Sequence, residues 1–225
     1  MTFEELRCLK EDGPVNVFML DHDPESAAKA HVDRHVIKMI VESAQLLSSA
    51  WHCLSNDYWD PLPDDEADDP PETITPWVRQ VVYAPGRPQP RLKSASGEVF
   101  FAHWELFGQR IYTKTHADHP AATWVRSLGG NYRWLWRLAV ALCDEYKYRY
   151  GRAHATLPVL WTLEAPPPPL VESLESWTEV PPVVPEECRV EQGGYYDTVA
   201  SYRMYYADKK RDLHAWTKRG PPIWL

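Results

Sequence analysis

A stripe of polar side chains recurs along one predicted helix, and its residue types are those used for proton transfer and nucleophilic attack. Its members are His31, His35, Lys38, Glu42 and Gln45, which follow one another at steps of four, three, four and three residues. At about 100° per residue, this spacing places all five on one side of a helix. An amine, a carboxylate and two imidazoles on one helix side suit general acid–base catalysis or an amine nucleophile.

The same stripe also fits a solvent-exposed helix face. Lys38 and Glu42 would then form an ordinary i,i+4 ion pair worth about 0.3 to 0.5 kcal/mol. The stripe lies beside the predicted apolar face, which contains Val36, Ile40 and Leu47, rather than opposite it. Side chains at such an edge tend to line a groove. Spacing alone leaves both interpretations open.

Two close histidine pairs raise the question of a metal site. His31 and His35 are i,i+4 neighbours, and His116 and His119 form a second pair. Four imidazoles could together bind Zn²⁺. However, the H-E-x-x-H motif is missing, no cysteine lies at ligand spacing, and the P-loop and Rossmann glycine motifs are also missing. We therefore expect no metal and no cofactor.

The polar stripe belongs to the clearest helix in the sequence. Asp23 is a suitable N-cap, Pro24 suits the first helical position, and residues 25–54 contain no Gly or Pro. We therefore expect one uninterrupted helix from Pro24 to about Leu54. The short apolar run at residues 16–20, which precedes it, is typical of a strand or an extended segment.

Further helices are predicted in the second half of the chain. A short one begins at Pro120, a longer one follows Gly129-Gly130 and ends near Gly151, and a last one spans about residues 197–218. Residues 56–95 carry turn signals, and residues 97–113 fit either a helix or a strand. The predicted fold is mainly α, a compact single domain formed by residues 1–225, whose length suits one core.

Charge is unevenly distributed along the chain. The net charge of −8 argues against a general nucleic-acid coat protein. Residues 56–75 contain eight acidic and no basic side chains, and residues 156–192 contain seven acidic side chains and one basic. Outside these two Pro-rich insertions, basic residues exceed acidic ones by six. The insertions have the composition of solvated or weakly ordered loops, which keep the protein soluble or shield a basic cleft until a polyanion displaces them.

The cysteines and the apolar runs indicate the cellular location of the protein. Cysteines at positions 8, 53, 143 and 188 lie far apart, without a C-x-x-C motif or a secretory signal before them. No apolar run has the length of a membrane span. We therefore expect reduced thiols, a cytoplasmic protein and no membrane partner.

Residues 116–154 mix basic and aromatic side chains. Such a mixture suits nucleic acid, because cations neutralise phosphates and flat rings stack on unpaired bases. It also occurs in amphipathic helices, where the aromatic rings belong to the core and a pair such as Glu145 and Arg149 lies at the surface. The mixture alone does not decide between the two.

Several segments together resemble a known family. Residues 33–47, DRHVIKMIVESAQLL, are similar to the D-R-R-L-x-K-x-x-x-E-x-x-Q-x-L helix of the pyrimidine-dimer DNA glycosylases of the phage endonuclease V type. Residues 119–126 and 143–151, HPAATWVR and CDEYKYRYG, resemble that family's H-P-x-x-x-W and C-D-E-W-x-x-R-G-Y segments in the same order. The C-terminal S-Y-R-x-Y-Y and P-x-x-W-L patterns resemble its closing elements, and the N-[IV]-F-x-L-D pattern at Asn16 is similar to uncharacterised phage members.

The resemblance implies a phage-related DNA repair or base-modification enzyme that handles a damaged or modified base. In the characterised members, the amine of the mature N-terminus attacks C1′ of a flipped nucleotide, a glutamate on the first helix assists, and the Schiff base allows strand cleavage. Here residues 1–15 form an extension before the matching segment, and the closest carboxylate is Glu42. Lys38 is then the natural nucleophile, with Glu42 or His35 as the acid–base group and His31 as a cationic neighbour.

The resemblance also implies residues that contact DNA. Trp124 or Tyr132 would fill the gap left by the flipped base. The candidates for phosphate binding are Arg34, His119, Arg126, Arg149 and Arg203. Two other functions would use the same cleft or scaffold: transfer of a group onto a hypermodified phage base, and binding of DNA or a host protein without catalysis.

Overall fold

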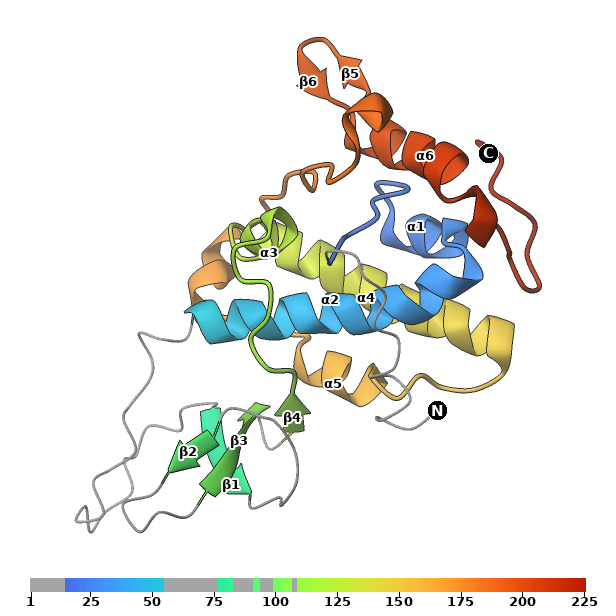
Figure 1. Cartoon of the computed structure of the whole chain (residues 1–225). Coiled ribbons are helices and arrows are strands. Elements are labelled where there is room, and N and C mark those ends of the chain that lie inside the picture. The colour runs from blue at the N-terminus through green and yellow to red at the C-terminus, as the bar shows by residue number, and fades with distance from the viewer. Residues whose placement is uncertain (1–14, 55–76, 83–90, 94–98, 107–108) are drawn as a thin grey trace.

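Two helices of 22 residues each, α2 (Asp33–Leu54) and α4 (Gly129–Tyr150), pack along each other at the centre of the molecule. The computed structural model describes residues 15–54, 77–82, 91–93, 99–106 and 109–225. Figure 1 shows α1 (Pro24–Ala30) and α6 (Thr198–Lys209) on one side of this helix pair and α5 (Leu157–Thr162) on the other. The fold is mainly α, as predicted. Within the described residues no helix is both long and apolar enough to cross a membrane.

The core lies where the apolar face of α2 predicts it. Val36, Met39, Ile40, Leu47 and Trp51 are all buried. Residues 15–20 are also buried and run as an extended segment without strand pairing. The ring of Phe18 in this segment contacts α2 and α6, so the segment fills the space between the two helices.

The helix expected from Pro24 to Leu54 is broken after Ala30. Its start is as predicted, because Asp23 accepts a hydrogen bond from the Ser26 amide at 2.9 Å. At the break, the Lys29 carbonyl accepts from Arg149 at 3.1 Å and the Ala30 carbonyl from the Trp216 indole at 3.0 Å. In a continuous helix these two carbonyls would accept hydrogen bonds from backbone amides one turn later. Here they accept from distant side chains instead, and the chain bends before α2 begins.

The start of α4 explains the double glycine. Gly129 and Gly130 form its first turn, rather than the break before it, and follow α3 (Pro120–Val125) after three residues. A Cβ atom on Gly129 would overlap the carbonyl oxygen of Leu170, and one on Gly130 the carbonyl oxygen of Ser176. The glycines are therefore required by the close approach of residues 168–177. Gly151 ends α4 with φ 72°, as the sequence predicts.

The second acidic insertion, residues 156–192, is an ordered part of the helical body rather than a weakly ordered loop. It contains α5 and two 3₁₀ turns, Pro168–Ser173 and Glu186–Cys188. Its apolar side chains Leu160, Leu163, Leu170, Val180 and Cys188 are buried, while most of its glutamates are exposed. The first insertion, residues 56–75, and residues 1–14 of the N-terminal extension lie outside the described residues.

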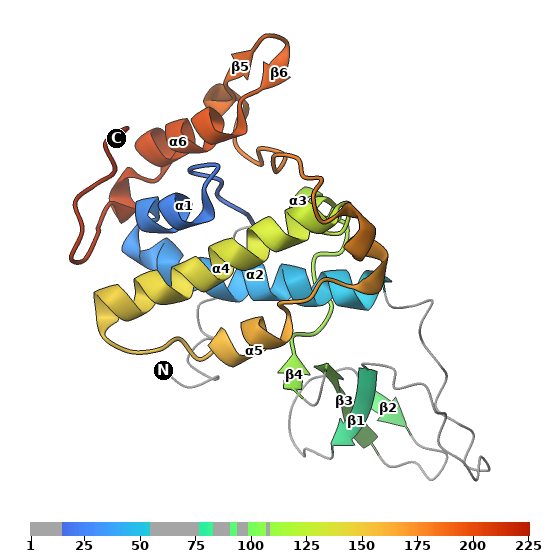
Figure 2. The same ribbon diagram turned by 180° about the vertical axis from the view of Figure 1, so that it is seen from behind.

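A small antiparallel sheet lies at one end of the helical body (Figures 1 and 2). Its strands are β1 (Trp77–Val82), β2 (Arg91–Lys93), β3 (Val99–Leu106) and β4 (Gln109–Ile111). β1, β2 and β4 all pair with β3, and Trp77 lies opposite Leu106 in the first of these ladders. The described residues of the segment 97–113, which fitted a helix or a strand, are therefore mainly strand. Leu106 and Ile111 are buried.

The C-terminal region departs from the predicted helix of residues 197–218. α6 ends at Lys209, and a 3₁₀ turn, Arg211–Leu213, leads into an extended tail. The tail is held by Asp33, whose carboxylate accepts hydrogen bonds from the Thr217 amide and hydroxyl. Before α6, the strands β5 (Glu191–Gln192) and β6 (Tyr195–Tyr196) form a hairpin that projects from the body.

Candidate functional site

The residues predicted to form one polar stripe do not share one helix, because His31 is the C-cap of α1 and the other four lie on α2. His31 and His35 are both buried. The His35 ring stacks on Phe18 with a centroid distance of 4.7 Å, and its Nδ1 shares a hydrogen bond of 2.5 Å with the Tyr206 hydroxyl. His31 Nδ1 donates to the Ala27 carbonyl at 2.6 Å. Both imidazoles therefore belong to the core.

Burial decides the charge of these two histidines. It lowers the pKa of His31 to about 4 and that of His35 to about 2, because a buried imidazolium loses its hydration. Both rings are neutral at pH 7 and out of reach of a macromolecular substrate. The prediction that His35 or His31 takes part directly in catalysis is therefore wrong.

The chain that follows β4 is bonded to α2 beyond the last stripe residue, Gln45, which is itself partly exposed. The Tyr112 amide donates to Ser48 Oγ at 3.3 Å, and His52 Nε2 donates to the Tyr112 carbonyl at 2.9 Å. Ser49 Oγ accepts from the Thr115 amide at 3.0 Å and donates to the Thr115 carbonyl at 2.9 Å. These bonds fix residues 112–115 along the C-terminal half of α2.

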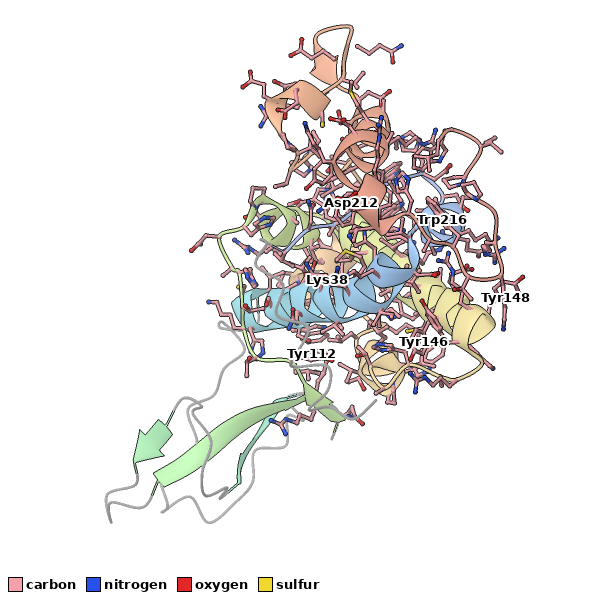
Figure 3. The ribbon with its side chains drawn as sticks, turned by 45° about the vertical axis from the view of Figure 1, so that its right-hand side comes forward. Lys38, Tyr112, Tyr146, Tyr148, Asp212 and Trp216 are labelled. Atoms are coloured by element: carbon pink, nitrogen blue, oxygen red, sulfur yellow. The ribbon has the colours of Figure 1, made fainter. Side chains whose placement is uncertain are left out.

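Beyond the buried histidines, Lys38, Glu42 and Gln45 are all partly exposed to solvent. Lys38 Nζ lies 3.2 Å from Glu42 Oε1, and the two side chains keep 22% and 12% of their exposure. The predicted i,i+4 pair is thus present, but not on a solvated helix face. Figure 3 shows Lys38 on α2, with Tyr112 toward the sheet and Tyr148 toward the opposite end of the body.

Glu42 is held in place from the side of the extended segment. Its Oε2 accepts a hydrogen bond of 3.2 Å from the Asn16 amide. Asn16 is fixed in turn, since its Oδ1 accepts from the Tyr202 hydroxyl at 2.8 Å and its Nδ2 donates to the Val183 carbonyl at 3.0 Å. The carboxylate therefore has one defined position beside the Lys38 amine.

Burial raises the pKa of Glu42, and the positive charge of Lys38 and the Asn16 amide oppose this only in part. A carboxyl group whose pKa lies closer to neutrality takes up and releases protons more readily at physiological pH. A partly buried amine beside such a carboxyl group is an arrangement suited to nucleophilic attack coupled to proton transfer. We refer to Lys38, Glu42 and the Asn16 amide as the α2 site.

The two histidine pairs do not form a metal site. His119 caps α3 by accepting a hydrogen bond from the Ala121 amide at 3.2 Å, and burial lowers its pKa. Across the part of the chain that the structure describes, no group of three or more His, Cys, Asp or Glu side chains could hold a metal ion.

Two aromatic residues predicted to stack against DNA lie in the core. Tyr132 is fully buried, and its hydroxyl donates to the Leu163 carbonyl at 2.8 Å and accepts from the Trp51 indole at 3.1 Å. Trp124 is buried as well, and its indole donates to the Thr178 carbonyl at 2.9 Å. Neither ring reaches the surface, so the prediction that one of them fills the gap left by a flipped base is wrong.

Arg149, another predicted phosphate ligand, is not accessible to a phosphate group. Its Nε donates to Glu145 at 2.7 Å and its Nη1 to Asp33 at 2.8 Å, and its side chain has no exposed surface. Glu145 in turn accepts two hydrogen bonds from Arg219. The Glu145–Arg149 pair predicted at the surface is therefore a buried network that joins α4 to α2 and to the C-terminal tail.

The other predicted phosphate ligands are scattered over the surface. Arg34 is exposed one turn before Lys38. Arg126 donates to the Ala117 carbonyl and to Thr123 Oγ1, and Arg203 donates to the Leu20 carbonyl and pairs with Asp21. Sequence reasoning missed Asn16 and Tyr202 as the residues that position Glu42. Asn16 lies 26 residues before Glu42 and Tyr202 lies 186 residues after Asn16, and no local pattern reveals either contact.

A separate pocket of about 480 Å³ lies between α1, α4 and the C-terminal tail. Its walls include Lys29, Arg137, Asp144, Tyr148 and Arg219, and none of the α2-site residues lines it. It is therefore distinct from the site predicted by sequence.

Comparison of the chain with models of protein families, with curated proteins and with solved structures gave no match. Any assignment of function therefore depends on the residues and geometry of the α2 site and on the resemblance described above.

Proposed function

We propose that this protein acts on DNA that carries a damaged or modified base, as a glycosylase and lyase. Lys38 serves as the nucleophile and Glu42 as the acid–base group. The observation that supports this most is the Lys38–Glu42 pair, which has a 3.2 Å separation, is partly open to solvent and is held in place through the Asn16 amide. An ordinary surface pair would have both ends in solvent.

The proposed chemistry begins with proton transfer from the Lys38 ammonium to Glu42. The neutral amine then attacks C1′ of the sugar, a C1′–N bond to Lys38 forms, and the bond from C1′ to the base breaks with its electron pair going to the base. Opening of the sugar ring yields a Schiff base between Lys38 and C1′. Loss of a C2′ proton and of the 3′ phosphate then cleaves the strand, as in other amine-dependent lyases.

Asn16 supports Lys38 rather than a backbone amine as the nucleophile. The resemblance implies an attacking amine at the start of the segment that matches residues 16–20. In this chain that position holds the Asn16 peptide N–H, which donates to Glu42. An amide nitrogen delocalises its lone pair into the carbonyl and does not attack carbon. The amine placed beside Glu42 is that of Lys38.

The charge distribution is compatible with DNA as the substrate. Outside the two acidic insertions, the chain has six more basic than acidic residues, and Arg34 lies exposed one turn from Lys38. Cations placed near a catalytic group can hold the phosphates on either side of the reacting nucleotide. The unpaired thiols of Cys53, Cys143 and Cys188 fit the proposed cytoplasmic location.

Borohydride trapping tests the proposal. The protein is incubated with duplex DNA that contains an abasic site, or with ultraviolet-irradiated duplex, in the presence of sodium borohydride, which reduces a Schiff base to a stable covalent adduct. We expect an adduct with the native protein and none with Lys38→Arg, because a guanidinium retains the charge but does not form a Schiff base. Lys209→Arg, which changes an exposed lysine on α6, is the matched control and should trap normally. No adduct with any of these substrates would overturn the proposal.

A further inference from the structure

The two oxygens of the Glu42 carboxylate have different partners. Oε1 lies 3.2 Å from Lys38 Nζ, whereas Oε2 accepts a hydrogen bond of 3.2 Å from the Asn16 amide. A protonated carboxyl group accepts a hydrogen bond best through its carbonyl oxygen, because its hydroxyl oxygen is the weaker acceptor. When Glu42 takes up a proton, the Asn16 amide therefore favours Oε1, the oxygen that faces Lys38, as the one that carries it.

This division suits the proposed reaction. Oε1 takes the proton of the Lys38 ammonium, and the carboxylic acid can give that proton to the base as the C1′–base bond breaks and the base receives the electron pair. Glu42 is then ionised again. Both proton transfers use the oxygen beside the amine as long as Oε2 stays bonded to the Asn16 amide. The reaction therefore depends on the position of this amide.

The Asn16 side chain fixes the position of its own backbone. Asn16 is buried, and its Oδ1 accepts hydrogen bonds of 2.8 Å both from the Val17 amide and from the Tyr202 hydroxyl. Its Nδ2 donates to the Val183 carbonyl at 3.0 Å. A rotation of Asn16 that moved its amide away from Glu42 would break these bonds, and buried polar groups without a partner are costly.

Tyr202 connects Asn16 to α6. It is fully buried, and its ring packs edge-on against Phe18 with a centroid distance of 5.6 Å. Its hydroxyl donates to Asn16 Oδ1 and accepts from the Val183 amide at 3.2 Å. The same hydroxyl therefore joins the extended segment to residue 183, whose carbonyl also holds Asn16. A residue of α6 thus reaches Glu42 through a single intermediary.

We infer that Tyr202 is a positioning residue of the α2 site, which acts through Asn16 to keep Glu42 Oε2 on the backbone amide and Oε1 toward Lys38. This inference rests on the proposed glycosylase and lyase function. Without the tyrosine hydroxyl, Asn16 loses one of the bonds that orient its amide, and the carboxylate is no longer held in one orientation. Because Tyr202 is fully buried, it does not contact DNA, and its loss slows the reaction rather than weakening binding.

The pH dependence of the reaction reports on this contact. Burial raises the pKa of Glu42, and the charge of Lys38, the Asn16 amide and the charge of His116 oppose this. Glu42 has to be ionised to accept the lysine proton, so the rate falls as pH decreases through the pKa of Glu42. A looser bond to the Asn16 amide raises this pKa, and the rate then begins to fall at a higher pH.

Tyr202→Phe tests the inference, because it removes the hydroxyl and keeps the ring. Strand cleavage of an abasic duplex is measured in single turnover as a function of pH and of protein concentration. We expect the limiting rate at pH 7 to fall about 10-fold and the half-saturating protein concentration to stay within about twofold. We expect the acid limb of the pH–rate profile to move up by about half a pH unit or more.

Tyr206→Phe is the matched control. It removes the hydroxyl of another buried tyrosine on α6, and that hydroxyl bonds to His35. We expect its limiting rate to stay within about twofold of the native rate, with the acid limb in place. A general loosening of α6 would affect both variants alike.

Asn16→Ala tests the route by which Tyr202 acts. This variant lacks both polar atoms of the side chain, and we expect the same changes in rate and pH profile. The double variant should be no slower than Asn16→Ala alone by more than about twofold, because Tyr202 has no other path to Glu42 in this account. If thermal denaturation shows that Tyr202→Phe does not fold, the pH profile of Asn16→Ala provides the test.

The failures of the two proposals can be told apart. If the native protein does not cleave the abasic duplex, the proposed function fails and this inference fails with it. If the native protein cleaves it, three results overturn the inference alone. The acid limb stays in place in Tyr202→Phe, or in Asn16→Ala where the former does not fold; the limb moves equally in Tyr206→Phe; or the effects of Tyr202→Phe and Asn16→Ala add in the double variant.

Discussion

Two ion pairs in this molecule share the same i,i+4 spacing and differ in their surroundings. On α4, Glu145 and Arg149 lie 2.7 Å apart with 3% and 0% of their side chains exposed. On α2, Lys38 and Glu42 lie 3.2 Å apart with 22% and 12% exposed. The sequence pattern is equivalent in the two helices, because each pair places opposite charges one turn apart.

The difference lies in how many hydrogen bonds each charged group has. All three nitrogens of Arg149 are used, by Glu145, by Asp33 and by the Lys29 carbonyl. The Lys38 ammonium has three protons, and among the described residues its ion pair is with Glu42. A fully bonded charge holds elements together, whereas a charge with donors to spare can bind or react with a ligand. The α4 pair is therefore structural, and the α2 pair is the one that we propose to react.

Arg149→Ala should have the largest effect on stability. Glu145 and Asp33 both pair with this guanidinium, so its removal deprives each carboxylate of an ion-pair partner. Of the two carboxylates, Glu145 is buried. Breaking a buried ion pair typically lowers the free energy of unfolding by about 3 to 5 kcal/mol. Chemical denaturation measures this loss, with Arg137→Ala on the exposed side of α4 as the control. A loss no larger than that of the control would contradict the structural role.

Acid should destabilise the protein through His31 and His35 before it reaches the carboxylates. The unfolded histidines bind protons below about pH 6.5, whereas the folded ones resist protonation down to about pH 4 and about pH 2. The unfolded state therefore binds more protons, and stability falls as pH decreases below 6.5. At pH 4.5 each buried histidine lowers the free energy of unfolding by about 2 to 3 kcal/mol relative to neutral pH.

Denaturation curves between pH 7 and pH 4.5 measure this slope. His31→Gln retains a side-chain donor for the Ala27 carbonyl but does not titrate, so it should flatten the slope. His22→Asn, at an exposed position, should not. A native protein whose stability is constant over this pH range would contradict the burial of both rings.

Lys38→Ala should have a small effect on stability and a large one on activity. Glu42 keeps the Asn16 amide and some solvent contact after the lysine is removed, and it can take up a proton because burial already raises its pKa. We expect the free energy of unfolding to fall by about 1 kcal/mol or less. If Lys38→Ala is as destabilising as Arg149→Ala, the distinction between the two pairs fails.

The exposed pair Arg133–Glu175 sets the lower limit of the comparison. Its two side chains keep 46% and 91% of their exposure at an N–O distance of 3.1 Å. Water screens such a pair, and Arg133→Ala should change the free energy of unfolding by about 0.5 kcal/mol or less. A larger loss in the same denaturation assay would mean that the contribution of an ion pair to the free energy of unfolding does not increase with its burial in this protein.

Local sequence signals predicted much of the helical framework. The Asp23 cap, the apolar face of α2 and the end of α4 at Gly151 depend on neighbours along the chain, and all three are present. The break before α2 was not predictable in this way, since it depends on Arg149 and Trp216. The early end of the last helix likewise depends on contacts of the tail with α2.

The candidate site shows the same limit. Spacing placed Lys38 and Glu42 together, and their contact follows from helix geometry. Whether a stripe residue is open or covered depends on the segments that pack over α2, here residues 15–20 and 112–115. Spacing therefore grouped His35 with Lys38, although only the latter reaches solvent. The role predicted for Trp124 of α3 and Tyr132 of α4 failed for the same reason, because helical periodicity does not show how many faces of a helix are covered.

The most direct test of the central claim is to locate the covalent adduct. The native protein is trapped with borohydride on an abasic duplex, digested with a protease, and the peptide that carries the sugar is identified by mass spectrometry. We expect the modified residue to be Lys38. Modification of any other amine, or a protein that forms no adduct, would contradict it.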